Sequence, residues 1–210
     1  EGNHAASAHR RSAPAFDLRG VRFHESVGRE ASTSWRVNSA EEAARFVSYM
    51  RYPPLGQRSF GPTRVSIAAR ANYASEANDN VLAFAMIETA DGMANLDAIA
   101  ATPGLDGIYV GPADLTLSLT QGRLAPGFDR QEPEMIAALQ RIVAACKANG
   151  IRAALHCGTP DYAARAIGWG FDMTTVGGDS RFLASAASAA VHGFRKLTET
   201  AGAKSEKGAY

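Results

Sequence analysis

The sequence predicts an α/β protein with parallel strands, and two observations lead to that prediction. Short apolar runs bounded by turn residues recur along the chain, and helical patterns of apolar residues separate them. Strands that alternate with helices in this way form parallel βαβ units. At 210 residues the chain is long enough for one domain with a substantial core. The four apolar runs are Val81–Ile87, Gly107–Val110, Ile151–Cys157 and Phe171–Val176.

The chain divides into three parts by composition. Residues 1–36 are rich in Arg, His, Ser and Ala without a helical or alternating pattern, so we expect poorly ordered coil there, with at most one short element at Val21–Phe23. Its three histidines have no fixed spacing and are interpreted as solvated: His4, His9 and His24. Residues 37–198 are expected to form the folded unit, and residues 199–210 a flexible tail.

The first helix begins with a capping box. Ser39 and Glu42 have the required spacing, and the helix should end before Tyr52, because a residue that precedes proline leaves the helical region. A Pro/Gly-rich loop then extends to Pro62. The Ala-rich segment from Arg64 to Ala77 is predicted to be helical, and residues 78–80 to break it before the first strand.

The later helices have clear boundaries. A short amphipathic segment follows the first strand, and a turn and a Gly/Pro-rich loop follow Leu115. A long helix is predicted for Glu132–Ala148, with a stop at Asn149-Gly150, and a second begins at Thr159-Pro160 and reaches Ile167. Asp179 or Ser180 should cap a last helix that ends near Thr198.

Two acids follow two neighbouring strands directly. Glu88 comes after the first apolar run, and Asp114 follows the second run and its Gly111-Pro112 turn. Functional groups collect at the carboxyl ends of parallel strands, so these two carboxylates should meet in one pocket. Such a pair either binds a hard divalent cation or shares a proton. The alternative is that each acid only caps the helix that follows it.

Composition excludes several partners. The formal net charge of +1 gives no electrostatic basis for binding nucleic acid or an anionic membrane, and no apolar run approaches the length of a membrane span. Cys146 and Cys157 have no metal-ligand spacing and are interpreted as buried thiols of a reducing compartment, so we expect a cytoplasmic protein. The start lacks the apolar core of a signal peptide. Because the chain begins with Glu1 and not Met, we expect a fragment or an incomplete gene product.

Three segments also carry a resemblance to a known family. They are residues 38–59 with the motif RYPPLGQRS, residues 84–115 with FAMIET and GPADL, and residues 156–184. Together they resemble the metal-dependent pyruvate aldolases of the 4-hydroxy-2-oxoheptanedioate and 2-dehydro-3-deoxyglucarate type. The resemblance implies a TIM-type (β/α)8 barrel. Since a complete barrel takes about 250 residues and only about four parallel strands are recognisable, we expect an incomplete barrel that corresponds to its second half.

The resemblance implies roles for particular residues. Glu88 and Asp114 would bind Mg²⁺, Mn²⁺ or Co²⁺, since two carboxylates with open positions suit a hard ion better than a structural zinc. Backbone groups of the Gly111-Pro112-Ala113 turn would cradle the carboxylate of a small 2-oxo acid. Met86 stands where the family often has a glutamine that contacts pyruvate. Arg58 would contact an anion near the mouth of the site, or is a surface arginine on a rigid linker.

The family's catalytic base is missing from this sequence. No Asp-x-Glu-His segment and no early-strand pyruvate-binding arginine are found. His156, at a strand end, is the remaining candidate, although a buried and hydrogen-bonded structural histidine is the more common case. We therefore expect an aldolase that cleaves 2-oxo-4-hydroxy acids to pyruvate and an aldehyde, with weak activity in this chain alone. The alternatives are a citrate-lyase β-type or phosphoenolpyruvate-utilising relative, and a truncated, inactive metal-binding domain that serves in assembly. Exposed strand edges and helix faces predict a homo-oligomer.

Overall fold

The computed structural model describes residues 36–61 and 73–206, and for residues 199–206 the backbone alone. The predictions for residues 1–35 and for a helix over residues 64–72 lie outside the described residues. A four-stranded parallel sheet in the order β1-β2-β3-β4 forms the centre, which confirms the predicted fold class. Its strands are β1 (Phe84–Ile87), β2 (Gly107–Val110), β3 (Arg152–His156) and β4 (Met173–Thr175).

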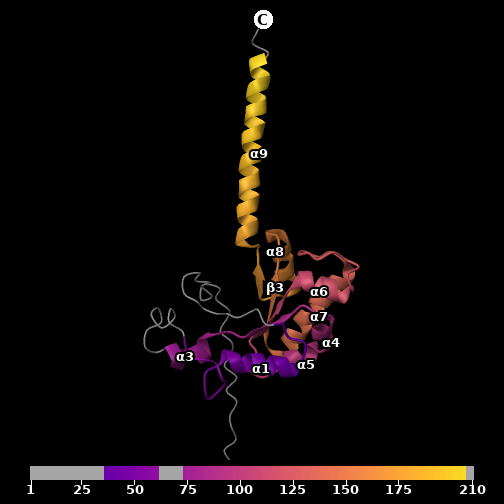
Figure 1. Ribbon diagram of the computed structural model, residues 1–210. Coiled ribbons are helices and arrows are strands. Elements are labelled where there is room, and N and C mark those ends of the chain that lie inside the picture. The colour runs from indigo at the N-terminus through magenta and orange to yellow at the C-terminus, as the bar shows by residue number, and fades with distance from the viewer. Residues whose placement is uncertain (1–35, 62–72, 207–210) are drawn as a thin grey trace, which may run out of the picture.

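Helices alternate with these strands as a parallel sheet requires. Figure 1 shows most of them gathered about the sheet as one unit, with α9 extending far away from it. In chain order they are α1 (Ala40–Met50), α3 (Tyr73–Asn80), α4 (Ala90–Ala94), α5 (Leu96–Ala100), α6 (Pro112–Leu119), α7 (Pro133–Asn149), α8 (Pro160–Trp169) and α9 (Asp179–Glu206).

The predicted helix signals at Ser39, Gly150 and Thr159 are confirmed. The Ser39 hydroxyl accepts a hydrogen bond from Glu42 N and begins α1, and the Glu42 carboxylate in turn accepts one from Asn38 N. Gly150 ends α7 in the left-handed conformation, with φ of 68°. The Thr159 hydroxyl caps α8 by accepting from Tyr162 N.

Three predicted boundaries are wrong. Residues 78–80 do not break α3, because the Asn78 side chain bonds to the backbone of Tyr52 instead of competing with its own helix. The segment after Leu115 is not a turn but the rest of α6. The last helix does not end near Thr198 but continues to Glu206, through a segment of mostly good helix formers.

The two faces of the sheet differ. Successive side chains of a strand point to opposite faces, so alternate residues share one environment. One face carries fully buried aliphatic side chains packed under the helices: Ile87, Ile108, Val110 and Leu155. The other face carries partly exposed side chains: Met86, Tyr109, His156 and Thr175. The site described below lies on this second face.

Candidate functional site

Glu88 directly follows β1 on the partly exposed face of the sheet. The next residue, Thr89, is the N-cap of α4 and donates to Asn38 Oδ1, which fixes the chain where it leaves the strand. The capping role considered for Glu88 is therefore taken by Thr89. The Glu88 side chain is only 15% exposed, and its Oε1 lies 3.7 Å from Arg36 Nε.

Asp114 comes from the neighbouring strand. Gly111 N bonds to Ile87 O at 3.2 Å, which extends the pairing of β1 and β2 by one residue. Pro112 then starts α6, and Asp114 is an exposed residue in its first turn. Among the described residues, no hydrogen bond involves the Asp114 carboxylate.

The two carboxylates interact electrostatically. The pKa of Glu88 is raised from its ordinary value, first by burial and then by the negative charge of Asp114, while Arg36 opposes the shift. The structure therefore places Glu88 and Asp114 beyond the carboxyl ends of β1 and β2, close enough for the charge of Asp114 to act on Glu88. Charge repulsion between them favours a cation or a proton in their vicinity.

Gly111 leaves room for the Glu88 carboxylate. A Cβ at position 111 would lie 2.6 Å from Glu88 Oε2, which is closer than side-chain atoms approach one another. Pro112 beside it is buried and Ala113 is half-buried. The expected cradle therefore lies next to the acid pair.

His156 is the last residue of β3 and makes specific contacts. Its Nδ1 lies 2.9 Å from the Tyr109 hydroxyl and 3.2 Å from Thr175 Oγ1, and the Phe128 ring packs on it at 4.7 Å between centroids. Burial and the charge of Arg181 lower the pKa of His156, and Asp129 opposes them. Burial raises the pKa of Tyr109, so its phenol stays protonated.

Strand register puts these groups on one face. Met86 is opposite Tyr109, and His156 is opposite Thr175. Met86 lies two residues before Glu88 and is partly exposed, so it belongs to the same face of the sheet. Sequence reasoning did not select Tyr109, Thr175 or Arg36. The alternation of β2 contained a signal for Tyr109, which lies two residues before Gly111 and shares its face.

Arg58 is not brought together with the acid pair. Its backbone N bonds to Arg51 O beyond the end of α1, and its guanidinium stacks over the Tyr52 ring at 4.9 Å. Arg51 in turn bonds to the carbonyl of Val81 and to Asp106, which precede β1 and β2. Arg58 therefore lies at the amino ends of the strands, opposite to Glu88.

The donor set suits a hard cation without forming a closed metal cage. Within residues 36–61 and 73–206, no group of three or more His, Cys, Asp or Glu side chains is arranged to bind a metal ion. Glu88 and Asp114 supply two carboxylates, and a hard ion completes its shell with water or substrate oxygens. The two acids therefore fit a Mg²⁺-like ion with open positions, whereas a structural zinc would require more ligands.

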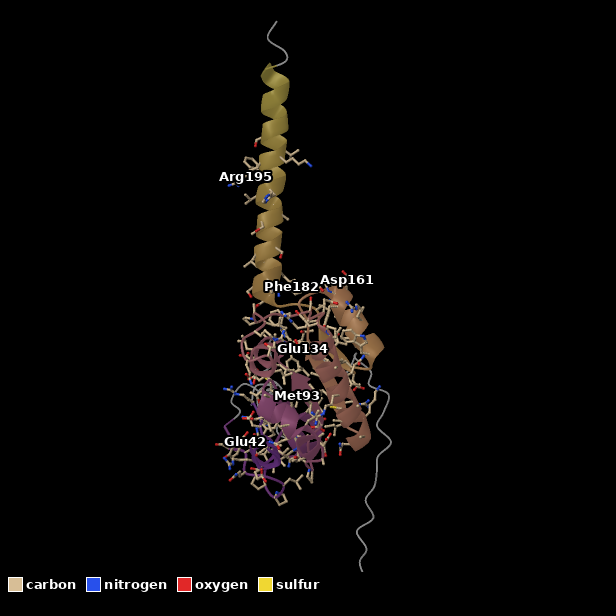
Figure 2. The ribbon with its side chains drawn as sticks, turned by 90° about the vertical axis from the view of Figure 1, so that its right-hand side faces the viewer. Glu42, Met93, Glu134, Asp161, Phe182 and Arg195 are labelled. Carbon is tan, nitrogen blue, oxygen red and sulfur yellow. The ribbon has the colours of Figure 1, made fainter. Side chains whose placement is uncertain are left out.

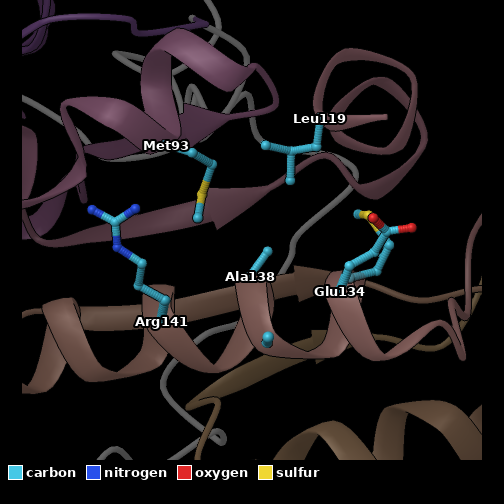
Figure 3. A pocket seen from close by; sticks show the side chains of 7 residues that line it. Met93, Leu119, Glu134, Ala138 and Arg141 are labelled. Atoms are coloured by element: carbon cyan, nitrogen blue, oxygen red, sulfur yellow. The ribbon is translucent and has the colours of Figure 1, made fainter. Parts of the chain in front are cut away.

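A hollow of about 360 Å³ lies elsewhere, among α4, α6 and α7. Figure 3 shows Met93 and Leu119 facing Ala138 across it, with Glu134 and Arg141 on either side of Ala138 along α7. Neither Glu88 nor Asp114 lines it. Of the helices that the structure describes, none combines the length and apolar character needed to cross a bilayer.

Known proteins resemble this chain over most of its length. It is 36% identical over 161 residues to a hydroxypyruvate/pyruvate aldolase of Rhizorhabdus wittichii, which covers 77% of this chain and 63% of that protein. It is also 36% identical over 172 residues to a 2-keto-3-deoxy-L-rhamnonate aldolase of Salmonella dublin, covering 80% of this chain and 62% of that protein. The chain thus spans less than two thirds of the length of either relative.

The fold agrees with solved structures of the same type. An HpcH/HpaI aldolase/citrate lyase family protein from Burkholderia cenocepacia superposes with a TM-score of 0.65 and 29% identity, over 76% of this chain and 62% of that one. This confirms the predicted α/β fold of the TIM-barrel type, here with four parallel strands. The model of the HpcH/HpaI aldolase/citrate lyase family matches residues 36–186, and the chain belongs to this family.

Proposed function

We propose that this chain supplies the metal-binding part of a divalent-metal-dependent aldolase, which cleaves 2-oxo-4-hydroxy acids to pyruvate and an aldehyde. The observation that carries the proposal is the placement of Glu88 and Asp114 after adjacent parallel strands, where the charge of Asp114 contributes to the raised pKa of Glu88. Burial of Glu88 beside a second negative charge raises its pKa. Because this environment disfavours the ionised form of the Glu88 carboxylate, a bound cation is expected to stabilise it.

Glu88 and Asp114 would bind Mg²⁺, Mn²⁺ or Co²⁺. A bound divalent ion supplies Lewis acidity, which polarises the 2-oxo group of the substrate and favours cleavage of the adjacent carbon–carbon bond. The backbone N–H groups of Ala113 and Asp114 open α6 and would hold the substrate carboxylate, with Gly111 and Pro112 shaping the turn. Met86 cannot donate a hydrogen bond and would only pack beneath the substrate.

The named relatives favour an aldolase among the activities considered. Both carry aldolase names, and the family description also includes citrate lyases. Their names specify hydroxypyruvate with pyruvate and a 2-keto-3-deoxy sugar acid, which are all small 2-oxo acids. We therefore propose a small 2-oxo acid as the substrate, and prefer cleavage to the citrate-lyase and inactive-domain alternatives.

We also propose a cytoplasmic homo-oligomer. Cys146 and Cys157 are buried free thiols, and burial raises the pKa of each to about 12, so they suit a reducing compartment as unreactive core residues. The protruding helix α9 exposes large apolar side chains, which favours association with a second copy.

The test is metal-dependent release of pyruvate from 4-hydroxy-2-oxoheptanedioate by the full chain. We expect turnover with Mn²⁺ or Co²⁺, none with EDTA, and loss of turnover in Glu88→Gln and Asp114→Asn. Asp97→Asn is the matched control, because Asp97 is an 81% exposed acid on α5. Activity that persists in EDTA, or in Glu88→Gln, would overturn the proposal.

A further inference from the structure

We propose that His156 is the acid–base residue of this site, which removes the proton of the substrate's 4-hydroxyl group, and that Tyr109 positions it. This inference rests on the proposed aldol cleavage. In that reaction the 4-hydroxyl proton passes to His156 while the C3–C4 bond breaks. The bond's electron pair stays on C3, which gives the aldehyde and the enolate of pyruvate. A proton then returns to C3, so atoms and charges balance.

The first argument is the level of His156 in the sheet. Tyr109 is opposite both Met86 on β1 and Ala154 on β3. Two residues farther along each strand come Glu88, Gly111 and His156, so these three lie in one row across the carboxyl ends. His156 is also opposite Thr175, which extends the row to β4.

The second argument is the gap between Glu88 and His156. Neighbouring strands lie about 4.8 Å apart, so the backbones of these two residues are separated by roughly 10 Å. The strand between them contributes Gly111, which has no side chain and leaves its space to the Glu88 carboxylate. A small 2-oxo acid held at Glu88 and Asp114 would extend past the Glu88 carboxylate toward His156. A base must come within hydrogen-bond reach of the proton that it removes, and this geometry permits it.

The third argument is the environment of the imidazole. Its Nδ1 faces two hydroxyl oxygens, Tyr109 at 2.9 Å and Thr175 at 3.2 Å, and either oxygen can accept the Nδ1 proton. Thr175 Oγ1 is itself fixed because it accepts from Cys157 N. In this tautomer Nε2 carries the lone pair, and protonation of Nε2 leaves the Nδ1 contacts unchanged.

Burial and the charge of Arg181 favour the neutral form of His156. Burial and Arg181 of α9 lower its pKa, and Asp129, from the loop before α7, opposes them. Asp129 also accepts from Gly158 N and Thr159 Oγ1, so part of its charge is engaged. Phe128 covers the ring of His156 and also lies under the Arg181 guanidinium, at 5.4 Å. A neutral imidazole at pH 7 is the form that a general base requires.

The test compares two reactions of the same chain with Mn²⁺. Aldol cleavage of 4-hydroxy-2-oxoheptanedioate needs a base for the hydroxyl proton. Decarboxylation of oxaloacetate also gives the enolate of pyruvate, but its leaving group is CO₂ and no hydroxyl proton has to be removed. We expect His156→Gln to reduce kcat of cleavage by about 10²–10⁴-fold, and to change decarboxylation and Mn²⁺ affinity by less than about 3-fold.

Two further variants use the pH profile. In the wild type, kcat/KM of cleavage should rise with pH through a midpoint below 6.5, and this limb should vanish in His156→Gln. Arg181→Gln removes a charge that lowers the pKa of His156, so its limb should move to higher pH. Tyr109→Phe should retain Mn²⁺ binding, lower kcat more than it raises KM, and move the limb to lower pH, because the imidazolium loses an acceptor.

Each outcome decides between the proposals. Absence of both reactions in the wild type overturns the proposed function itself. Decarboxylation without cleavage in the wild type likewise contradicts the proposed aldol cleavage. Where the wild type cleaves, equal cleavage by wild type and His156→Gln, or equal loss of both reactions in His156→Gln, overturns the role of His156 alone. An Arg181→Gln limb that does not move would also contradict the assignment of that limb to His156.

Discussion

The carboxylate of Glu88 occupies the space that a side chain on Gly111 would need. A Cβ at residue 111 would lie 2.6 Å from Oε2 and 3.2 Å from Cβ of Glu88. Gly111 is not one of the described glycines with a positive φ. The requirement for glycine at this position is therefore steric and not conformational. The absence of a side chain thus helps to set where the Glu88 carboxylate points.

Gly111→Ala is expected to weaken metal binding more than it weakens the fold. The added methyl group displaces the Glu88 carboxylate, and displaced ligands are expected to lower Mn²⁺ affinity by about 10-fold or more, as outer-sphere changes do. Titration calorimetry with Mn²⁺ measures this. Gly168→Ala in α8 is the control, because a Cβ there meets open space and should leave binding unchanged. Equal affinities of Gly111→Ala and wild type would contradict the steric argument.

Asp114→Asn is expected to lower the pKa of Glu88. That pKa is raised from 4.5, first by burial and then by the charge of Asp114, and the substitution removes the second cause. An acid whose pKa is raised in the folded state reduces stability as pH rises from its unfolded pKa through its folded one. Without metal, the variant should therefore lose less stability than the wild type above pH 4.5.

Carbon-13 titration of the Glu88 carboxyl group and urea unfolding at pH 4 and pH 7 measure these two effects. Asp97→Asn serves as the control, since that acid is 81% exposed and lies on α5, beyond the helix α4 that follows Glu88. An unchanged Glu88 titration in Asp114→Asn would show that the two carboxylates do not interact.

Arg51→Ala is expected to destabilise the fold strongly. The guanidinium of Arg51, 10% exposed, donates to the carbonyls of Val81 and Gly104 and pairs with Asp106 at 2.8 Å. Asp106 also accepts from Ala83 N, so one pair fixes the amino ends of β1 and β2. Removing one partner of a buried ion pair costs about 3–5 kcal/mol of unfolding free energy. Because the Asp106 side chain is 34% exposed, we expect a loss near the lower end, about 3 kcal/mol.

Urea denaturation of Arg51→Ala and Arg123→Ala makes the comparison. Arg123 pairs with Glu134 on the surface, with side chains 60% and 48% exposed, so its loss should cost about 1 kcal/mol or less. Similar losses for the two variants would show that burial does not determine the strength of the Arg51 pair.

The strands were predictable because each is a short apolar run between turn residues. The run Gly107–Val110 is β2 without change of bounds. The end of α6 was not predictable from propensity. Thr116 and Thr120 look like turn residues, but their buried hydroxyls donate to the carbonyls of Pro112 and Thr116 within the helix.

The acid pair could be predicted from the strand topology. The contacts of His156 could not, because they depend on the register of the strands. Carboxyl ends of neighbouring parallel strands meet, so Glu88 and Asp114 were expected to converge. Tyr109 reaches His156 diagonally across the sheet, and a shift of one residue would put it on the other face. Arg58 was expected near the site from the family resemblance. The structure instead places Arg58 at the amino ends of the strands, because α1 ends there.

The protruding helix α9 is expected to hold copies of this chain together. Figure 2 shows Phe182 at its base and Arg195 far along it, beyond the rest of the unit. Leu183, Phe194 and Leu197 on this helix are 73%, 67% and 73% exposed, which is a large apolar surface to leave in water. With Ala187 and Ala190 they repeat at alternating steps of four and three residues, the spacing of a helix that packs along another helix.

Phe194→Glu combined with Leu197→Glu should therefore convert an oligomer into a monomer. The matched control combines Ser185→Glu with His192→Glu, which adds two carboxylates at exposed positions outside this repeat and should leave the oligomer intact. Light scattering coupled to size exclusion at micromolar concentration gives the mass, and circular dichroism checks that the helix persists. A folded monomer in the wild type, or dissociation of the control variant to the same extent, would contradict a specific role of this apolar repeat in assembly.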